Sequence, residues 1–202
     1  MYANVDQLLN KKDDLEMLIA DNNPDIMLFT EVIPKAQQNP IDENQIKIEG
    51  YEHYPNFNFS DKNLGSSGMR GVIIYVRDNI SCKKVSPSST NRDHIWVELN
   101  LGKNDILLCG CMYRSPTKEM ENKKITTEEV SRVLGEMSEH KKQMIICGDF
   151  NYPEIDWEYE YVSDSHDVIR PFINAVQDNL LYQHIYISQP GIEPGMSPRY
   201  LT

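Results

Sequence analysis

The stretch MIICGDFNYPEIDW, residues 144–157, runs from a short apolar segment into an acidic turn. Residues 144–147 have the length and apolar character of one buried strand, and Gly148 ends the run. Asp149 and Asn151 then follow in a turn that contains a proline. The sequence therefore predicts a strand that delivers an acid and an amide to its end, and a second segment would have to complete any site there.

Length and composition place the chain among globular proteins. It has 202 residues, 40% of them hydrophobic, which is enough for one domain with its own core. No apolar run approaches the roughly 20 residues that cross a bilayer, so no membrane association is expected. The first residues lack a secretory signal, which favours a nuclear or cytoplasmic location. The net charge of -11 opposes nonspecific binding of nucleic acid by the whole surface, although it leaves room for a local basic patch.

The cysteines and histidines show no metal-ligand spacing. None of the four cysteines forms a C-x-x-C pair, so buried free thiols are favoured over a zinc or redox site. The five histidines have no H-x-x-x-H spacing, which argues against zinc. The segment Ser163 to His166 precedes a helical pattern with no apolar strand before it, so helix capping is favoured over acid-base chemistry.

The order of predicted elements indicates a mixed α/β domain. Helical spacing covers residues 5–22 and 168–181, and the stretch TTEE at 126–129 is typical of a capping box that opens another helix. Apolar runs bounded by turn residues predict strands at 25–29, 50–54, 71–76, 80–85, 94–101, 106–113 and 144–147. The middle strands are joined by short turns, which argues against an all-parallel sheet and favours sheets packed face to face with helices outside.

Two acids, Glu31 and Asp149, each follow an apolar strand. Mg²⁺ prefers hard oxygen ligands and often needs only one or two protein carboxylates beside phosphate and water. Neighbouring strands could bring both acids to one rim of a sheet. From position alone, a polar residue at a strand exit is the more frequent explanation for either of them.

Four further residues add neutral donors and one cation: Asn4, Tyr113, Arg114 and Asn151. Such groups can hold a phosphodiester and stabilise the extra negative charge of its transition state. Each has a structural alternative. Asn4 could cap a helix and Asn151 could serve the turn. Tyr113 could be a half-buried strand residue, and Arg114 a solvated strand end.

Several segments together resemble a known family. They are YANVDQLLNKKDDLEMLI, PDIMLFTEV, GMRGVIIYVRD, LLCGCMYRSP, ICGDFNYPEIDW and AVQDNLLYQHI. In this order they resemble the endonuclease domain of non-LTR retrotransposons, in the endonuclease/exonuclease/phosphatase superfamily with deoxyribonuclease I and the apurinic endonucleases. The resemblance implies a four-layer α/β/β/α sandwich of two mostly antiparallel sheets with outer helices.

The resemblance also implies roles for the candidate residues. Glu31 would bind Mg²⁺, with Asn4 next to the metal. Asp149 would orient or polarise the attacking water, and Asn151 would contact the scissile phosphate. Tyr113 would hydrogen-bond the same phosphate.

Arg114 is implied as a neighbour that touches the DNA backbone. The implied reaction is Mg²⁺-dependent hydrolysis of one DNA strand. In the family such a nick primes reverse transcription by a reverse transcriptase domain on the same polypeptide. A monomer is expected.

Two departures from the family pattern stand out. The family's late Ser-Asp-His motif does not occur in the sequence, and Met1 lies only three residues before Asn4. We therefore expect one domain, residues 1–202, truncated at both ends, with its first strand clipped or absent and with little or no nuclease activity. The alternatives are another phosphoesterase of the same superfamily and a noncatalytic module that keeps the fold for binding.

Overall fold

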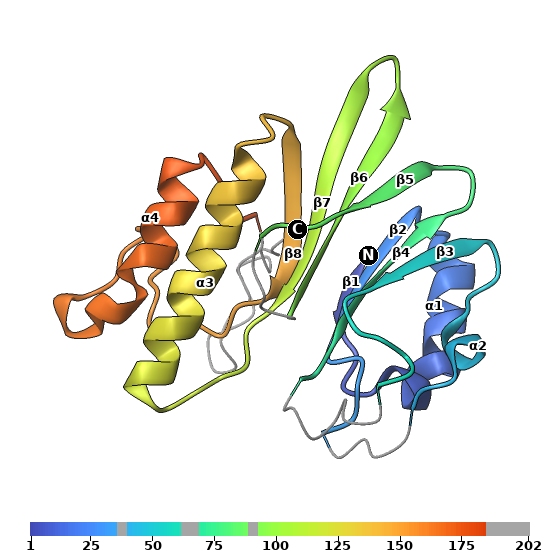
Figure 1. Ribbon diagram of the computed structural model, residues 1–202, viewed down its shortest axis with the longest axis horizontal. Coiled ribbons are helices and arrows are strands. Elements are labelled where there is room, and N and C mark those ends of the chain that lie inside the picture. Colours follow the sequence, from blue (N-terminus) through green and yellow to red (C-terminus); the bar gives the residue numbers. More distant parts are fainter. Residues whose placement is uncertain (36–39, 62–68, 89–92, 185–202) are drawn as a thin grey trace, which may run out of the picture. The chain divides into compact units, whose positions relative to one another are not determined.

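The computed structural model describes residues 1–35, 40–61, 69–88 and 93–184 (Figure 1). The chain divides into two compact units, the first formed by residues 1–86, 90–113 and 142–149 and the second by 87–89, 114–141 and 150–202. The helical elements of the first unit are a 3-10 helix (Leu8–Lys11), α1 (Lys12–Asn22) and α2 (Glu43–Ile46). Its strands are β1 (Tyr2–Asn4), β2 (Ile26–Thr30), β3 (Tyr51–Pro55), β4 (Val72–Arg77), β5 (Ser81–Val85), β6 (His94–Gly102), β7 (Asp105–Tyr113) and β8 (Gln143–Asp149).

These strands form two mixed sheets of four, in the orders β1-β2-β4-β3 and β5-β6-β7-β8. Each sheet has one parallel pair, β1 with β2 and β7 with β8, and its other pairs are antiparallel. The prediction of two mostly antiparallel sheets is therefore confirmed. A parallel pair brings two carboxyl ends to the same edge, so each sheet ends in two strand exits side by side.

The alternation of side chains along β2 and β4 divides the core of the first unit into two layers. Phe29 and Tyr75 point to the face that packs with Leu15 of α1, whereas Leu28 and Ile74 point to the opposite face. On that opposite face the sheet packs against apolar side chains of the second sheet: Ile95, Val97, Leu99, Cys109, Cys111, Tyr113 and Cys147. Figure 1 shows α1 beside the first sheet. The period of two along each strand is what allows one sheet to serve two cores.

The prediction for the thiols is confirmed. All four cysteines are free, with Cys109, Cys111 and Cys147 buried and Cys82 partly buried. Burial raises the pKa of the Cys109 thiol to about 12 and that of Cys147 to about 11. These thiols are core side chains in their neutral form.

The N-terminal helix is shorter than predicted. Instead of one helix over 5–22, the 3-10 helix precedes α1, and Leu18 is 46% exposed rather than buried. Asn23 ends α1 in a left-handed conformation, and its amide donates to the carbonyl of Ile19 at 2.8 Å. The predicted strand at 25–29 follows as β2, and the first strand of the sheet is present as three residues, β1.

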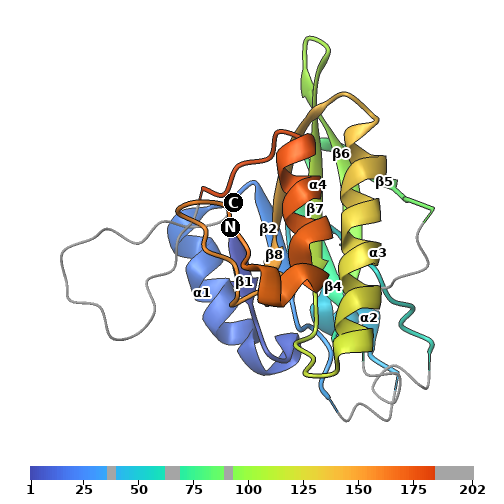
Figure 2. The same ribbon diagram turned by 90° about the vertical axis from the view of Figure 1, so that its left-hand side faces the viewer.

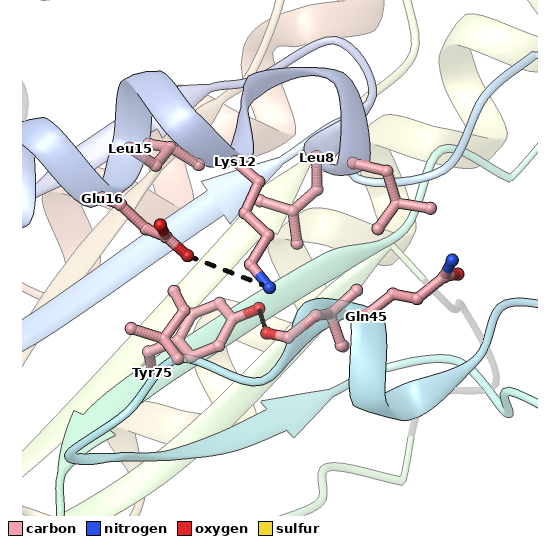
Figure 3. A pocket seen from close by; sticks show the side chains of 9 residues that line it. Leu8, Lys12, Leu15, Glu16, Gln45 and Tyr75 are labelled. Carbon is pink, nitrogen blue, oxygen red and sulfur yellow. Dashed lines mark hydrogen bonds and ion pairs between the residues drawn. The ribbon is translucent and has the colours of Figure 1, made fainter.

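A small cavity lies under α1, lined by Leu8, Lys12, Leu15, Glu16, Gln45 and Tyr75 among others (Figure 3). Its volume is about 10 Å³, which is no more than a single water requires. The Tyr75 hydroxyl donates to the carbonyl of Ile46 at 2.7 Å, so the polar group at its wall is satisfied. The cavity is a packing gap rather than a ligand site.

The second unit contains α3 (Met120–Ser138), a 3-10 helix (Asp164–Ile169) and α4 (Arg170–Asp178). Figure 2 shows α3 and α4 side by side. Phe172 of α4 packs against the rings of Phe150, Tyr152 and Trp157, with centroid separations of 5.3, 4.6 and 6.2 Å. This aromatic cluster anchors the turn that follows β8 onto α4.

The predicted capping box at 126–129 is wrong, because α3 begins six residues earlier, at Met120. The hydroxyl of Thr126 donates to the carbonyl of Asn122 at 2.9 Å, and that of Thr127 to the carbonyl of Lys123 at 2.7 Å. A threonine hydroxyl bonded to the preceding turn is compatible with a helix interior. The predicted apolar face is confirmed, since Val130, Val133, Leu134 and Met137 are buried.

The two mixed sheets and the accompanying helices are those of the predicted α/β sandwich class. In the part of the chain that the structure describes, no helix is long and apolar enough to cross a lipid bilayer.

Candidate active site

Four strands of the first unit, β1, β2, β7 and β8, end in polar side chains at one end of the sandwich. Asn4 is the last residue of β1 and pairs with Thr30, the last residue of β2, so that Glu31 comes directly after this pair. In the second sheet, Asp149 is the last residue of β8 and pairs with Tyr113, the last residue of β7. The parallel pairing places all of these side chains at carboxyl ends of strands.

The side-chain amide of Asn4 joins the two predicted acids. Its Nδ2 donates to Oε1 of Glu31 at 2.8 Å and lies 3.5 Å from Oδ2 of Asp149, while its Oδ1 accepts from the backbone N–H of Asp6 at 3.3 Å. Residues 27 and 145 positions apart in sequence thus meet at one amide. The structure brings together three of the six predicted residues.

Glu31 adopts an unusual backbone conformation, with φ of 56°. The left-handed region is unfavourable for a residue other than glycine, asparagine or aspartate, and such strain persists only where surrounding contacts impose it. Here the carbonyl of Glu31 accepts from the N–H of Gln7 at 2.8 Å, and the next amide, Val32 N–H, donates to the carbonyl of Gly71 at 3.3 Å. The carboxylate is mostly buried, with 16% of the side chain exposed.

Arg70 was absent from the predicted site, yet it contacts the Glu31 carboxylate directly. Its Nη1 lies 2.5 Å from Oε2 of Glu31, its Nη2 lies 2.5 Å from Oδ1 of Asp6, and its Nε donates to the carbonyl of Ile33 at 3.0 Å. Only 4% of Arg70 is exposed. In the sequence, Arg70 stands immediately before Gly71 at the start of an apolar strand, within the segment GMRGVIIYVRD that contributes to the family resemblance.

Tyr113 is more buried than the predicted half-buried strand residue, with 5% exposed, and it belongs to the core between the sheets. Its backbone N–H donates to the carbonyl of Asp93 at 2.8 Å. Its pairing with Asp149 places Tyr113 at the same end of the sheet as that acid. A hydrogen bond from its hydroxyl to a phosphate stays a prediction. Tyr2 lies nearby, where burial, with the charge of Asp149 as a smaller cause, raises the pKa of its hydroxyl.

Arg114 and Asn151 belong to the second unit, where they bind each other's backbone. Arg114 Nη1 donates to the carbonyl of Asn151 at 2.9 Å, and the Asn151 amide donates to the carbonyl of Arg114 at 2.8 Å. The guanidinium also lies 4.1 Å from the ring centre of Tyr152. With 3% exposed, Arg114 is not the solvated strand end that the sequence allowed. It fixes the turn in which Asn151 adopts a φ of 51°.

The segment 163–166 has a local structural role. Ser163 stands at the N-cap of the 3-10 helix, as predicted, but its hydroxyl lies 2.9 Å from Nδ1 of His166 instead of bonding a backbone amide. Ser165 Oγ is 3.1 Å from the same ring nitrogen.

The donor set at the end of the sandwich fits a hard cation. Glu31 offers a carboxylate held on both oxygens, and Asn4 offers an amide oxygen. Within the described residues, no group of three or more His, Cys, Asp or Glu side chains could hold a metal ion. This excludes an all-protein cage there but suits Mg²⁺, which keeps several waters and binds through one or two protein ligands plus phosphate.

A family model described as the endonuclease/exonuclease/phosphatase family matches residues 1–185. The fold is similar to the AP endonuclease LMAP from Leishmania major, with a TM-score of 0.58 and 16% identity over 93% of this chain and 72% of that one. It is similar to the endonuclease domain of TRAS1, a telomere-specific non-LTR retrotransposon, with a TM-score of 0.57 and 16% identity over 99% and 80%.

A 3′ phosphatase from Neisseria, NExo, bound to a product DNA hairpin, has a TM-score of 0.55 and 16% identity over 94% and 78%. A comparison with curated proteins finds no match. At these identities the solved structures confirm the fold.

Proposed function

The chain belongs to the endonuclease/exonuclease/phosphatase family, and we propose that it hydrolyses phosphodiester bonds of DNA with Mg²⁺ as its cofactor. The observation that carries this proposal is the Asn4 amide that joins Glu31 and Asp149 where β1, β2 and β8 end. Three separate strands thus bring an amide and two acids together, and hydrolysis of a phosphodiester requires such groups to bind a metal ion and to orient the attacking water.

Glu31 and Asn4 would hold the metal ion. When bound, Mg²⁺ supplies neutralisation of charge on the phosphate. Glu31 is suited to this role because hydrogen bonds fix both of its carboxylate oxygens while leaving a lone pair on each. The bonds to Asn4 and Arg70, rather than the backbone conformation, keep the carboxylate in a single orientation.

Asp149 would orient and polarise the attacking water. A carboxylate accepts hydrogen bonds from water, and Oδ2 of this one lies 3.5 Å from the Asn4 amide that also binds Glu31. Asn151 and Tyr113 would donate to the nonbridging oxygens of the phosphate as neutral groups. Arg114 would act mainly through the turn carbonyls that it binds, and a direct contact with the DNA backbone is the secondary expectation.

The finer proposal is an endonuclease of a non-LTR retrotransposon that nicks one strand of its target site. The six quoted sequence segments support it, as does the similarity of the fold to the TRAS1 endonuclease domain. The nick would leave a 3′-hydroxyl that primes reverse transcription by a reverse transcriptase domain on the same polypeptide of the parent element. A monomer in the nucleus or cytoplasm fits this role.

Nicking of a supercoiled plasmid with Mg²⁺ tests the proposal. Because Glu31 and Asp149 both contact Asn4, wild type should, contrary to the inactivity expected from the sequence, convert supercoiled to open-circular DNA, and the rate for Asp149→Ala should be at least about 100-fold lower. Asp13→Ala is the matched control, because Asp13 is an exposed acid in the first turn of α1. Equal rates for wild type and Asp149→Ala would remove Asp149 from the reaction.

A second candidate is another phosphoesterase of the same superfamily, favoured by the similarity to AP endonucleases and to a 3′ phosphatase. Product analysis on intact DNA, DNA with an abasic site and inositol phosphates separates the candidates. Cleavage confined to abasic DNA or to a phosphomonoester would favour this reading over target-site nicking.

The third candidate is a binding module that keeps the fold without the chemistry. The net charge of -11 favours a protein partner over DNA. Salt-dependent DNA binding without cleavage by wild type would support a noncatalytic role, whereas Asp149-dependent nicking would exclude it.

A further inference from the structure

Arg70 carries an inference that goes beyond the residues assigned above and rests on the proposed metal site. We propose that Arg70 is a positioning residue that holds Glu31 in the orientation required to bind a divalent cation. The guanidinium bonds Glu31, Asp6 and the carbonyl of Ile33 simultaneously, through three different nitrogens. It would act on the cation only through Glu31.

Glu31 needs such a partner because its backbone adopts the left-handed conformation, which is unfavourable for glutamate. A residue held in a sparsely populated region of φ/ψ costs about 1–3 kcal/mol, so contacts must compensate. Asn4 binds Oε1 of the carboxylate and Arg70 binds Oε2. Asn4 is exposed, whereas Arg70 is buried, so the bond to Arg70 is the one shielded from competition by water.

Arg70 is itself fixed by the chain around it. The backbone N–H of Ile33 donates to the carbonyl of Arg70 at 2.7 Å, and the Arg70 Nε returns a bond to the carbonyl of Ile33. The next residue, Gly71, has a φ of 68°, and a Cβ there would lie 2.7 Å from Cδ1 of Ile33. The bonds between Ile33 and Arg70 therefore hold the segment after β2 against the segment before β4, and they orient the guanidinium toward Glu31.

The shape of the guanidinium matters more than its charge. Three bonds diverge from one planar group, and a lysine ammonium on a flexible stem cannot reproduce that fork. Arg70→Lys therefore keeps the charge of the site while removing the geometry. Partners that orient a metal ligand from behind typically account for about 10–100-fold in metal affinity.

Binding of Mn²⁺ to the full chain, measured from the EPR signal of the free ion, tests the inference without reference to activity. Arg70→Lys should bind Mn²⁺ about 10–100-fold more weakly than wild type. Arg77→Lys, at the far end of β4, is the matched control, because Arg77 pairs with Asp25 at 3.1 Å and should leave the affinity within about twofold. Circular dichroism establishes that each variant is folded at the temperature of the measurement.

The outcomes separate this inference from the proposed function. If Glu31→Gln loses Mn²⁺ binding but Arg70→Lys binds within about twofold of wild type, the positioning role is wrong and the metal site stands. If Glu31→Gln binds like wild type, or wild type does not bind, the metal site is wrong and the inference falls with it. Should Arg70→Lys not fold, Arg70→Gln replaces it. Loss of a positive charge alone would strengthen Mn²⁺ binding, whereas loss of positioning weakens it.

Discussion

Within residues 144–157, replacement of Gly148 is the sharpest test of the packing between β7 and β8 next to Asp149. It pairs with Met112 in the parallel β7–β8 ladder, one residue before Asp149. A Cβ built on Gly148 would lie against the carbonyl oxygen of Met112 and 2.9 Å from its carbonyl carbon. The obstacle is backbone, so no rotamer change can relieve it. We therefore expect Gly148→Ala to push the ends of β7 and β8 apart.

The size of this effect follows from the contact distance. Carbon atoms pack at about 3.5–4.0 Å, so the Cβ and the Met112 carbonyl carbon must separate by about 0.6–1.1 Å more than they do now, and the carbonyl oxygen, which lies nearer, must move at least as far. Overpacking of this kind costs typically 1–3 kcal/mol, and the rigid neighbour favours the upper end, about 3 kcal/mol. For a chain of this length that lowers the midpoint of thermal unfolding by about 6–12 °C. Asp149 would move with the strand, and a displacement near 1 Å lowers the nicking rate by about 100-fold.

Urea unfolding followed by circular dichroism measures the free energy of unfolding of Gly148→Ala. Gly135→Ala in α3 is the matched control, because a Cβ there meets nothing within 4 Å and a helix interior gains about 0.5–1 kcal/mol from this change. A free energy of unfolding within about 0.5 kcal/mol of wild type for Gly148→Ala would show that the β7–β8 ladder accommodates the added methyl group.

Two further predictions concern the first unit. Burial raises the pKa of all three thiols Cys82, Cys109 and Cys147, but only Cys82 is partly accessible, so in native protein at pH 8 a disulfide reagent should react with Cys82 well before the other two; equal rates for the three would contradict this. Hydrogen bonds from Lys142 and Lys83 lower the pKa of Glu98 in the folded state. Ionised Glu98 therefore contributes to the free energy of unfolding above its unfolded-state pKa of about 4.3, and this contribution is lost as the pH falls through the folded-state pKa. Glu98→Gln should therefore lower the free energy of unfolding by about 1 kcal/mol at pH 7 and converge with wild type once the pH is below the folded-state pKa of Glu98, and a difference independent of pH would contradict the pairing.

The strands could be predicted from the sequence because burial imposes a clear pattern on them. Leu28 and Phe29 face opposite cores, which makes β2 a continuous apolar run, and the turn residues around it mark its ends. The contact of both Glu31 and Asp149 with Asn4 was one of two possibilities that the sequence left open, because a polar residue at a strand exit was the more frequent explanation for each acid. The start of α3 was mispredicted since a threonine pair serves a helix interior as well as a cap.

Arg70 could not be predicted as part of the site, because its role depends on a contact between the end of β2 and the start of β4 rather than on a local pattern. Its partner Glu31 lies 39 positions earlier, and nothing in the composition around Arg70 separates it from a surface arginine. The burial of Arg114 was hidden for the same reason. Side chains whose partners come from distant segments become visible only in the folded chain.

Mg²⁺-dependent nicking by wild type and Glu31→Gln, measured side by side on supercoiled plasmid, tests the central claim most directly. We expect wild type to nick the plasmid in a reaction that EDTA abolishes and added Mg²⁺ restores, and we expect the rate for Glu31→Gln to be lower by at least about 100-fold. Nicking that persists in EDTA, or a Glu31→Gln variant as fast as wild type, would contradict it.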